Sequence, residues 1–222
     1  MNVGVIVFPG SNCDHDCYYA VRDDIQEKAQ LIWHEDSNLP SGLDLVVLPG
    51  GFSYGDYLRC GAIAKFSKII PEIISFAKNG GHVLGICNGF QILTEIGLLP
   101  GALLLNTSRK YICKDVFLSV NNNKTLFTNT FTKKQVITVP IAHGEGRYHI
   151  NSEGLNKIKA NEQIAFKYTN KNGQATEQDN PNGSIENIAG IFNKNKNVLG
   201  MMPHPERRSR WDQDCKEILK LK

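Results

Sequence analysis

The chain has 222 residues, of which 41% are hydrophobic and 21% are charged, so it can bury a full core without disulfides. Its formal net charge of +3 is too small to indicate binding to nucleic acid or to an anionic membrane. No apolar run approaches the roughly 20 residues that span a bilayer, and the apolar start lacks the basic region of a signal peptide. We therefore expect a cytoplasmic protein that binds neither nucleic acid nor membrane. Its six cysteines include no CxxC pair, so we expect reduced thiols and no bound metal.

In the first hundred residues, predicted strands alternate with predicted helices. Residues 3–8 are continuously apolar, as in a strand buried on both faces, and apolar side chains spaced four apart predict a helix over residues 14–29. Further strands are expected at 30–34, 44–48 and 82–86, and further helices at 71–79 and 89–96. This alternation is typical of a parallel βαβ sheet.

The second half of the chain changes character, because predicted strands follow one another with short connections. They lie at residues 116–120, 136–141, 164–168, 188–192 and 198–202. Residues 171–173 predict a hairpin turn, and residues 193–197 predict another tight turn. We interpret the Asn- and Lys-rich composition of residues 156–197 as solvated loops rather than a binding tract. With no linker and no internal repeat, residues 1–222 are predicted to form one domain.

The motif Gly85-Ile86-Cys87-Asn88-Gly89 follows a predicted buried strand and opens a predicted helix. This is the arrangement of a nucleophile elbow, in which flanking glycines allow a sharp turn and the helix N-terminus favours a thiolate. The same turn directs the backbone N–H of Asn88 toward an oxyanion formed on attack by Cys87. The alternative interpretation is that Cys87 is a small buried side chain in a glycine-flanked turn.

A thiolate nucleophile needs a base, and the base needs a group that orients it. His204 and Glu206 follow a predicted strand and alternate with Pro203 and Pro205, which favour an extended backbone before them. Residues two apart in an extended chain project to the same side, so Glu206 can hold the imidazole of His204 at the strand ends. The alternative is a capped turn with a surface histidine.

His143 is the third candidate for a functional side chain. It lies in residues 142–148, a polar, glycine-punctuated segment that follows a predicted strand. Loops of this kind commonly contact a substrate or a partner, and a simple connecting loop is the alternative.

Together these motifs resemble the class I, or triad, glutamine amidotransferases. Residues 85–91, with His204 and Glu206, carry that resemblance. Within the family, residues 9–14, 51–62 and 142–148 are similar to the glutaminase subunits of phosphoribosylformylglycinamidine synthases of purine biosynthesis. The similarity runs along essentially the whole chain and is weakest over residues 156–197.

The resemblance implies an α/β fold with a flavodoxin-like, mostly parallel sheet, helices on both faces and added antiparallel strands in the C-terminal half. It also implies hydrolysis of L-glutamine to glutamate and ammonia. In this reaction Cys87 is the nucleophile, His204 carries the proton, and Glu206 orients the imidazole and stabilises its charged form.

The resemblance also implies residues that bind the substrate. The backbone amides of Gly51 and Asn88 are expected to form the oxyanion hole. Gln91 and His143 are the expected contacts for the rest of the glutamine.

The chain contains no Walker-type phosphate loop and no dinucleotide-binding glycine motif. An ATP-driven amination that uses the ammonia therefore needs another polypeptide to bind ATP. The resemblance implies that this chain holds no cofactor, and that ATP and magnesium sit on a large synthetase subunit, in many bacteria joined by a small third subunit. Residues 53–59 and the arginines at 207, 208 and 210 are candidate docking surfaces, although the arginines also fit a solvated C-terminal turn.

Three alternative functions have weaker support in the sequence. A cysteine hydrolase of the chaperone-like or peptidase type shares the sheet and the elbow but normally lacks the C-terminal His-Pro-Glu. A catalytically silent subunit that regulates a synthetase would be free to lose Cys87 or His204. Nucleic-acid binding by the basic C-terminus has no aromatic-interleaved basic stripe to support it.

Overall fold

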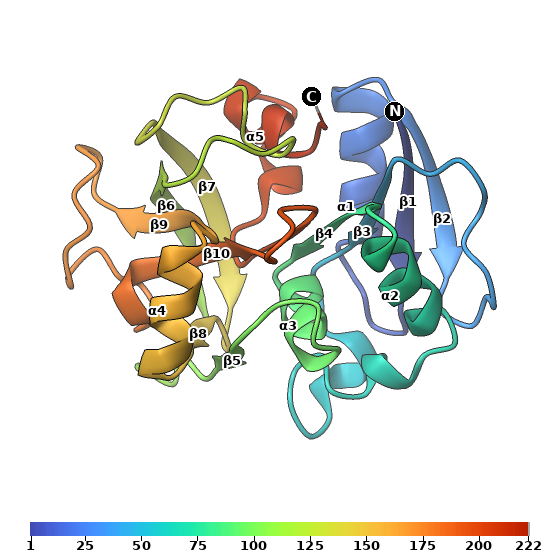
Figure 1. Ribbon diagram of the computed structural model, residues 1–222, viewed down its shortest axis with the longest axis horizontal. Coiled ribbons are helices and arrows are strands. Elements are labelled where there is room, and N and C mark those ends of the chain that lie inside the picture. Colours follow the sequence, from blue (N-terminus) through green and yellow to red (C-terminus); the bar gives the residue numbers. More distant parts are fainter. Residues whose placement is uncertain (222) are drawn as a thin grey trace.

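Five parallel strands form one side of the central sheet in the computed structural model, which describes residues 1–221 (Figure 1). They are β1 (Asn2–Val7), β2 (Lys28–Trp33), β3 (Leu45–Leu48), β4 (His82–Ile86) and β11 (Val198–Met201), in the spatial order β2-β1-β3-β4-β11. This is the strand order of flavodoxin-like folds, whose sites lie beyond the carboxyl ends of the strands near the β1–β3 switch point. The predicted fold class is confirmed.

Antiparallel strands extend the same sheet beyond β11. They are β10 (Ile188–Phe192), β9 (Ile164–Thr169), β6 (Ile112–Val120) and β7 (Val136–His143), in that spatial order. Residues 193–197 form the predicted tight turn between β10 and β11. A separate antiparallel pair, β5 (Ala102–Leu104) and β8 (Arg147–His149), was not predicted, because three-residue strands give too little pattern. The predicted domain extends to residue 222, which lies outside the described residues.

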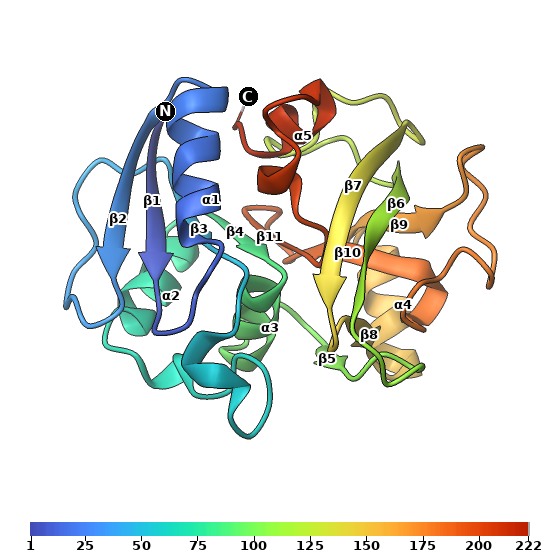
Figure 2. The same cartoon turned by 180° about the vertical axis from the view of Figure 1, so that it is seen from behind.

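Helices cover both faces of the sheet. α2 (Ile70–Lys78) and α3 (Asn88–Glu95) lie on the face toward the viewer in Figure 1, and α1 (Asp14–Tyr19) and α5 (Gln213–Ile218) lie on the face shown in Figure 2. α2 has Pro71 in its first turn and ends just before Gly80, whose φ is +91°, as expected for helix ends. α4 (Ser152–Ala160) was not predicted; the side chain of Asn151 caps its start. Within residues 1–221, no helix is long and apolar enough to cross a membrane.

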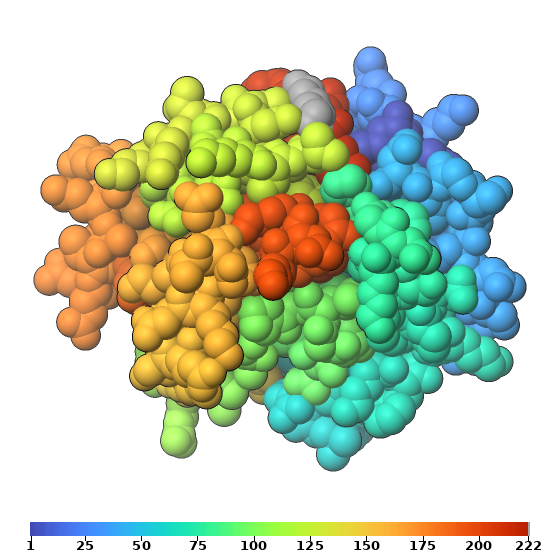
Figure 3. Space-filling model, in the orientation of Figure 1, coloured from blue at the N-terminus to red at the C-terminus, as the bar shows by residue number. Residues whose placement is uncertain are grey.

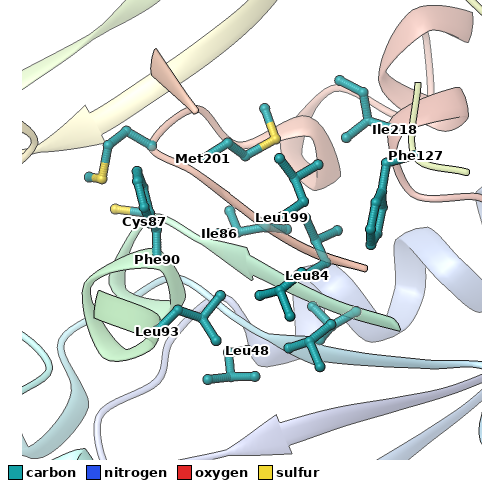
Figure 4. Packing of buried hydrophobic residues seen from close by; sticks show 14 of the residues in the cluster. Leu48, Leu84, Ile86, Cys87, Phe90, Leu93, Phe127, Leu199, Met201 and Ile218 are labelled. Atoms are coloured by element: carbon teal, nitrogen blue, oxygen red, sulfur yellow. The ribbon is translucent and has the colours of Figure 1, made fainter. Parts of the chain in front are cut away.

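The apolar strands predicted from the sequence form the centre of the core. Figure 4 shows side chains of β3, β4 and β11 packed against α3. The fully buried residues among them are Leu48, Leu84, Ile86, Phe90, Leu93, Leu199 and Met201. Each such side chain contributes about 1.5–3 kcal/mol relative to an exposed position, so this packing fixes the strand ends on which the site is built.

β11 is the last strand of the chain, yet it lies between β4 and β10 rather than at an edge. Met201 pairs with Ile86 in parallel register, and the N–H of Cys87 donates to the carbonyl of Met201 at 2.8 Å. Figure 3 shows the orange-red segment around the β10–β11 turn between the green first half and the gold second half. The segments that follow β4 and β11 therefore start side by side, which brings together the two motifs that contain Cys87 and His204.

Two predictions about local structure are wrong. The helix expected over residues 14–29 is shorter, because α1 passes into a π-helical turn (Ala20–Asp24) and the chain then reverses at Gln26, whose φ is +56°. Ala29 belongs to β2 instead. Residues 171–173 do make a tight turn, with Gly173 at φ +78°, but no strand follows until β10, so the turn closes no hairpin.

The Asn- and Lys-rich residues 156–197 do not consist of solvated loops alone. They include β9 and β10, which are almost wholly buried. Asn182 is fully buried and its side chain donates to the carbonyl of Gly146 at 2.8 Å; the Asn187 side chain donates to the carbonyl of Thr176 at 2.7 Å. These asparagines are structural, since buried amides need hydrogen-bond partners.

Candidate active site

The turn between β4 and α3 forces Cys87 into a strained backbone conformation, with φ +49° and ψ −103°. Only glycine fits at the position two residues before Cys87 and at the position two residues after it. A Cβ on Gly89 would lie 1.9 Å from the carbonyl oxygen of Leu48, and a Cβ on Gly85 would lie 2.4 Å from a methyl of Leu93. Strain of this kind persists at functional sites because the surrounding structure holds it, and here it presents the thiol at the helix N-terminus.

The thiol of Cys87 is 5% exposed and faces the end of β7. It donates to the carbonyl oxygen of Ala142, with the sulfur and oxygen 3.7 Å apart. The sulfur that follows β4 therefore lies beside the end of β7.

His204 and Glu206 form a buried pair directly after β11. Their Nδ1 and Oε1 atoms are 2.6 Å apart, and the two side chains are 2% and 0% exposed. The N–H of His204 donates to the carbonyl of Pro140 at 2.8 Å, which ties this segment to β7. Burial opposes the charged imidazole, but the carboxylate of Glu206 and the nearby Cys87 outweigh it and raise the pKa of His204 well above its usual range.

The other ring nitrogen of His204, Nε2, is buried without a hydrogen-bond partner in residues 1–221. Because Nδ1 is held by Glu206, Nε2 is the nitrogen left to exchange a proton with a nucleophile. The hydrogen bond between nucleophile and base is often open before substrate binds, and the Cys87 thiol here is turned to Ala142.

The loop after β3 lies against the elbow. Asn88 is fully buried; its Oδ1 accepts from the N–H of Ser53 at 3.2 Å, and its Nδ2 donates to Oε1 of Gln91 at 2.9 Å. Gly51 has φ +127°, and a Cβ there would lie 2.6 Å from the backbone N of Asn12. Gly51 and Asn88 thus come from two loops that are joined beside the nucleophile.

Gln91 and His143 are both held by neighbouring polar groups. Gln91 donates from Nε2 to the carbonyl of Glu145 at 2.7 Å. His143 is the last residue of β7 rather than a loop residue, is 3% exposed, and lies between Asn106 (3.1 Å from Nδ1) and Asn182 (3.5 Å from Nε2). Burial, together with the nearby charge at the base, lowers the pKa of His143 to about 4, so the ring is neutral at pH 7.

A third side chain, Cys13, lies beside the His204–Glu206 pair. One ligand-type atom from each of these residues lies within 4.8 Å of the others. The donor types suit zinc, but the contacts do not: two ligands of one zinc ion lie about 3.3 Å apart or more, and Nδ1 and Oε1 are already at 2.6 Å. The guanidinium of Arg207 also donates to the sulfur of Cys13 at 3.0 Å, and its positive charge opposes a bound cation.

Two aromatic side chains border the entrance to the site. Phe52 and Tyr111 are 43% and 55% exposed, and their rings are stacked with centroids 6.5 Å apart. The cavity that they line with Gly51, Ala142 and His204 measures about 30 Å³. That is room for about one water molecule.

The model of the CobB/CobQ-like glutamine amidotransferase domain matches residues 1–216. The chain belongs to this family. A phosphoribosylformylglycinamidine synthase subunit PurQ from Chlorobaculum parvum is 56% identical over 209 residues, which cover 94% of this chain and 82% of the relative. The same subunit from Salinibacter ruber is 54% identical over 204 residues, covering 92% and 86%. A chain in the structure of PurLQS from Thermotoga maritima is 44% identical, with a TM-score of 0.84 and coverage of 98% and 94%.

The amidotransferase domain thus has its predicted nucleophile, base and carboxylate in one place. The elbow and the His-Pro-Glu segment gave local signals that sequence reasoning could find. Cys13, Tyr111, Asn106 and Asn182 were missed, because each reaches the site through a loop whose position depends on the tertiary fold. The one signal for Cys13 was its position in residues 9–14. These residues carry part of the family resemblance, but the sequence alone gave them no role in the site.

Proposed function

We propose that this chain is the glutaminase subunit of a phosphoribosylformylglycinamidine synthase. It hydrolyses L-glutamine and passes the ammonia to a synthetase partner, which converts formylglycinamide ribonucleotide to formylglycinamidine ribonucleotide with ATP. The observation that carries the proposal is the strained Cys87 beside the buried His204–Glu206 pair, in a chain more than half identical to PurQ subunits.

In the acylation step, the sulfur of Cys87 attacks the side-chain amide carbon of glutamine. Nε2 of His204 takes the thiol proton, and the backbone amides of Gly51 and Asn88 bind the oxygen that becomes negative. The C–N bond then breaks, His204 returns the proton to the nitrogen, and ammonia leaves a thioester on the cysteine. Whenever the ring of His204 is protonated, the carboxylate of Glu206 stabilises its positive charge through the short Nδ1–Oε1 contact.

In the deacylation step, water attacks the thioester. His204 removes a proton from the water, and the same two backbone amides stabilise the second tetrahedral intermediate. Collapse of this intermediate releases glutamate and regenerates the Cys87 thiol. We propose that Gln91 and the segment that begins at His143 contact the α-amino and α-carboxylate end of the substrate, since both adjoin Cys87.

Ammonia has to reach a second active site. The structure of PurLQS from Thermotoga maritima combines PurL, PurQ and PurS, and we infer the same large and small partners for this chain. We propose that ATP and magnesium bind to the large partner and that this chain binds no cofactor of its own. A cytoplasmic location follows from membership in this nucleotide pathway.

The loop after β3 is the best candidate for a docking surface. Tyr57 and Leu58 are 74% and 92% exposed, which is unusual for large apolar side chains and fits contact with another subunit. The neighbouring Asp56 accepts from Nδ2 of Asn88 at 3.4 Å. A partner bound to this loop would therefore be linked to the elbow through the side chain of Asp56. Arg208, in contrast, is already paired with acidic groups of this chain.

The test is release of glutamate from glutamine by this chain, alone and with the large and small subunits, ribonucleotide substrate and Mg-ATP. We expect release to rise in the complex and to vanish in Cys87→Ala, while amination with added ammonium salt continues. Cys215→Ala, which removes another buried free thiol, is the control and should stay active. Unchanged glutamate release by Cys87→Ala would show that Cys87 is not the nucleophile. A folded wild-type chain that releases no glutamate in the complex would disprove the glutaminase function.

A further inference from the structure

Residues 9–13, between β1 and α1, pack directly beneath the loop that contains Gly51. The N–H of Phe52 donates to the carbonyl of Gly10 at 3.0 Å, and the N–H of Tyr54 donates to the carbonyl of Pro9 at 2.6 Å. This is the β1–β3 switch point, where flavodoxin-like folds place their sites. The mechanism above assigns no task to the one reactive side chain in this segment, Cys13.

The sulfur of Cys13 is 1% exposed and has a charged partner. The Nη2 of Arg207 donates to it at 3.0 Å, and the Nε of the same guanidinium lies 3.5 Å from Oδ2 of Asp16. Arg207 directly follows Glu206 in the chain, so a contact with Cys13 joins the segment after β11 to the segment after β1. A guanidinium at this distance from sulfur is a charge-assisted contact, which is stronger than a neutral one.

The same sulfur touches the imidazole of the base. A Cβ built on Gly50 would lie 2.6 Å from Cε1 of His204 and 3.2 Å from the sulfur of Cys13, so the ring edge and the sulfur share one small space. Nδ1 of His204 is hydrogen-bonded to Glu206, and the sulfur of Cys13 is a further partner of the same ring. The sulfur of Cys13 therefore adds a second contact to the imidazole, beside the one from Glu206.

We propose that Cys13 and Arg207 form a positioning pair for His204, in which Arg207 fixes the sulfur and the sulfur holds the imidazole edge toward Cys87. The inference rests on the proposed glutaminase function and adds two residues to it. Neither side chain touches the reacting atoms, so both act through the base. An electron-rich sulfur beside the ring also favours the imidazolium that forms during catalysis.

Other charged or titratable groups face His204 and bear on the test. Glu206 lies on its own segment, Cys87 comes from the elbow, and His143 and Tyr111 come from β7 and the segment before β6. Substitution of Cys13 leaves all of them in place. A change in the pH dependence of glutaminase activity in such a variant therefore reports on the Cys13 contact itself.

The experiment compares Cys13→Ala, Cys13→Ser and a matched control, Cys17→Ala, in the complex with the synthetase subunits. Cys17 is a buried thiol in the first turn of α1, four residues after Cys13. We expect Cys13→Ala to lower kcat about 10-fold or more with little change in KM, because a small misplacement of a catalytic group costs that much. We also expect the acidic limb of its kcat/KM profile to move to lower pH. Cys13→Ser, whose hydroxyl still accepts from Arg207, should recover most of the rate, and Cys17→Ala should match the wild type.

Two results would overturn the proposal. One is a Cys13→Ala enzyme with wild-type kcat and pH profile. The other is an equal loss in the alanine and serine variants with an unshifted profile, which would mean that the sulfur only fills space. Thermal unfolding of each variant separates loss of rate from loss of fold. If the wild-type complex itself releases no glutamate, the proposed function fails instead, so the two failures are distinguishable.

Discussion

Replacing Cys87 by alanine and by glycine separates the energy of backbone strain from the loss of the thiol. Both variants lack the nucleophile, so both should be inactive with glutamine. Alanine keeps a Cβ at φ +49° and ψ −103°, a region that few residues other than glycine adopt, whereas glycine relieves the strain. The difference in unfolding free energy between the two variants therefore measures the strain that the fold imposes on the elbow.

The expected size of that difference follows from three contributions. Strained backbone costs about 1–3 kcal/mol, and this conformation belongs at the upper end of the range. Against it, glycine loses about 0.5–1 kcal/mol through chain entropy. It also loses about 0.8 kcal/mol from the missing buried methyl group. We expect Cys87→Gly to be about 1 kcal/mol more stable than Cys87→Ala, or roughly 2–4 °C in Tm for a chain of this size.

Urea unfolding at pH 7, followed by far-ultraviolet circular dichroism, gives the two free energies, and equal m-values confirm that the comparison is valid. The control is the same pair of substitutions at Ser152, the first residue of α4, where no positive φ occurs. There glycine should be the less stable by about 0.5–1 kcal/mol. If glycine is also the less stable residue at position 87, the elbow is not strained and our reasoning about its geometry is wrong.

Three further outcomes are expected. Glu206→Gln should lower kcat/KM for glutamine roughly 100-fold or more, and should move the acidic limb of the pH profile to lower pH, because the carboxylate raises the pKa of His204 and the base must be neutral to accept the thiol proton. His143 has a pKa of about 4 in the folded chain and near 6.5 unfolded, so the wild type should lose up to about 3 kcal/mol between pH 6.5 and 4, a loss that His143→Gln should reduce. Gly89→Ala should cost more than about 3 kcal/mol in urea unfolding, since its Cβ would meet the carbonyl of Leu48 at 1.9 Å.

Each of these outcomes can fail in a definite way. A Glu206→Gln enzyme with an unshifted acidic limb would show that the carboxylate does not raise the pKa of the base. Identical pH dependence of unfolding in the wild type and in His143→Gln would show that the fold does not lower the pKa of this ring. Gly144→Ala is the control for Gly89→Ala, because the nearest atom to its Cβ would be 3.8 Å away, and a similar loss there would refute the steric argument.

The parts of the site that the sequence predicted are those built within a few residues. The glycines around Cys87 and the prolines around His204 each determine their own backbone, so the elbow and the extended base segment could be read locally. The pairing of β4 with β11 could not, because strand order depends on how the whole sheet packs. The register of Met201 with Ile86 is what brings the two local motifs into one site.

The residues that sequence reasoning misjudged are polar groups whose role depends on distant partners. Asn182 lies in a stretch that reads as solvated, but the fold buries it against the segment after β7, where it donates to Gly146. His143 reads as an exposed loop residue, but β7 continues through it and two asparagines enclose its ring. Composition describes the average environment of a segment, and these side chains depart from that average.

The central place of β11 also bears on how the protein is made. A ribosome that has finished β4 but not residues 198–206 exposes a chain with its cysteine in place, no base, and β4 as an open strand edge. Open edges of this kind pair readily with other chains. The newborn polypeptide is therefore expected to be inert toward glutamine until residues 198–206 have been made, and a product that lacks them is a candidate for aggregation or degradation rather than a source of stray ammonia.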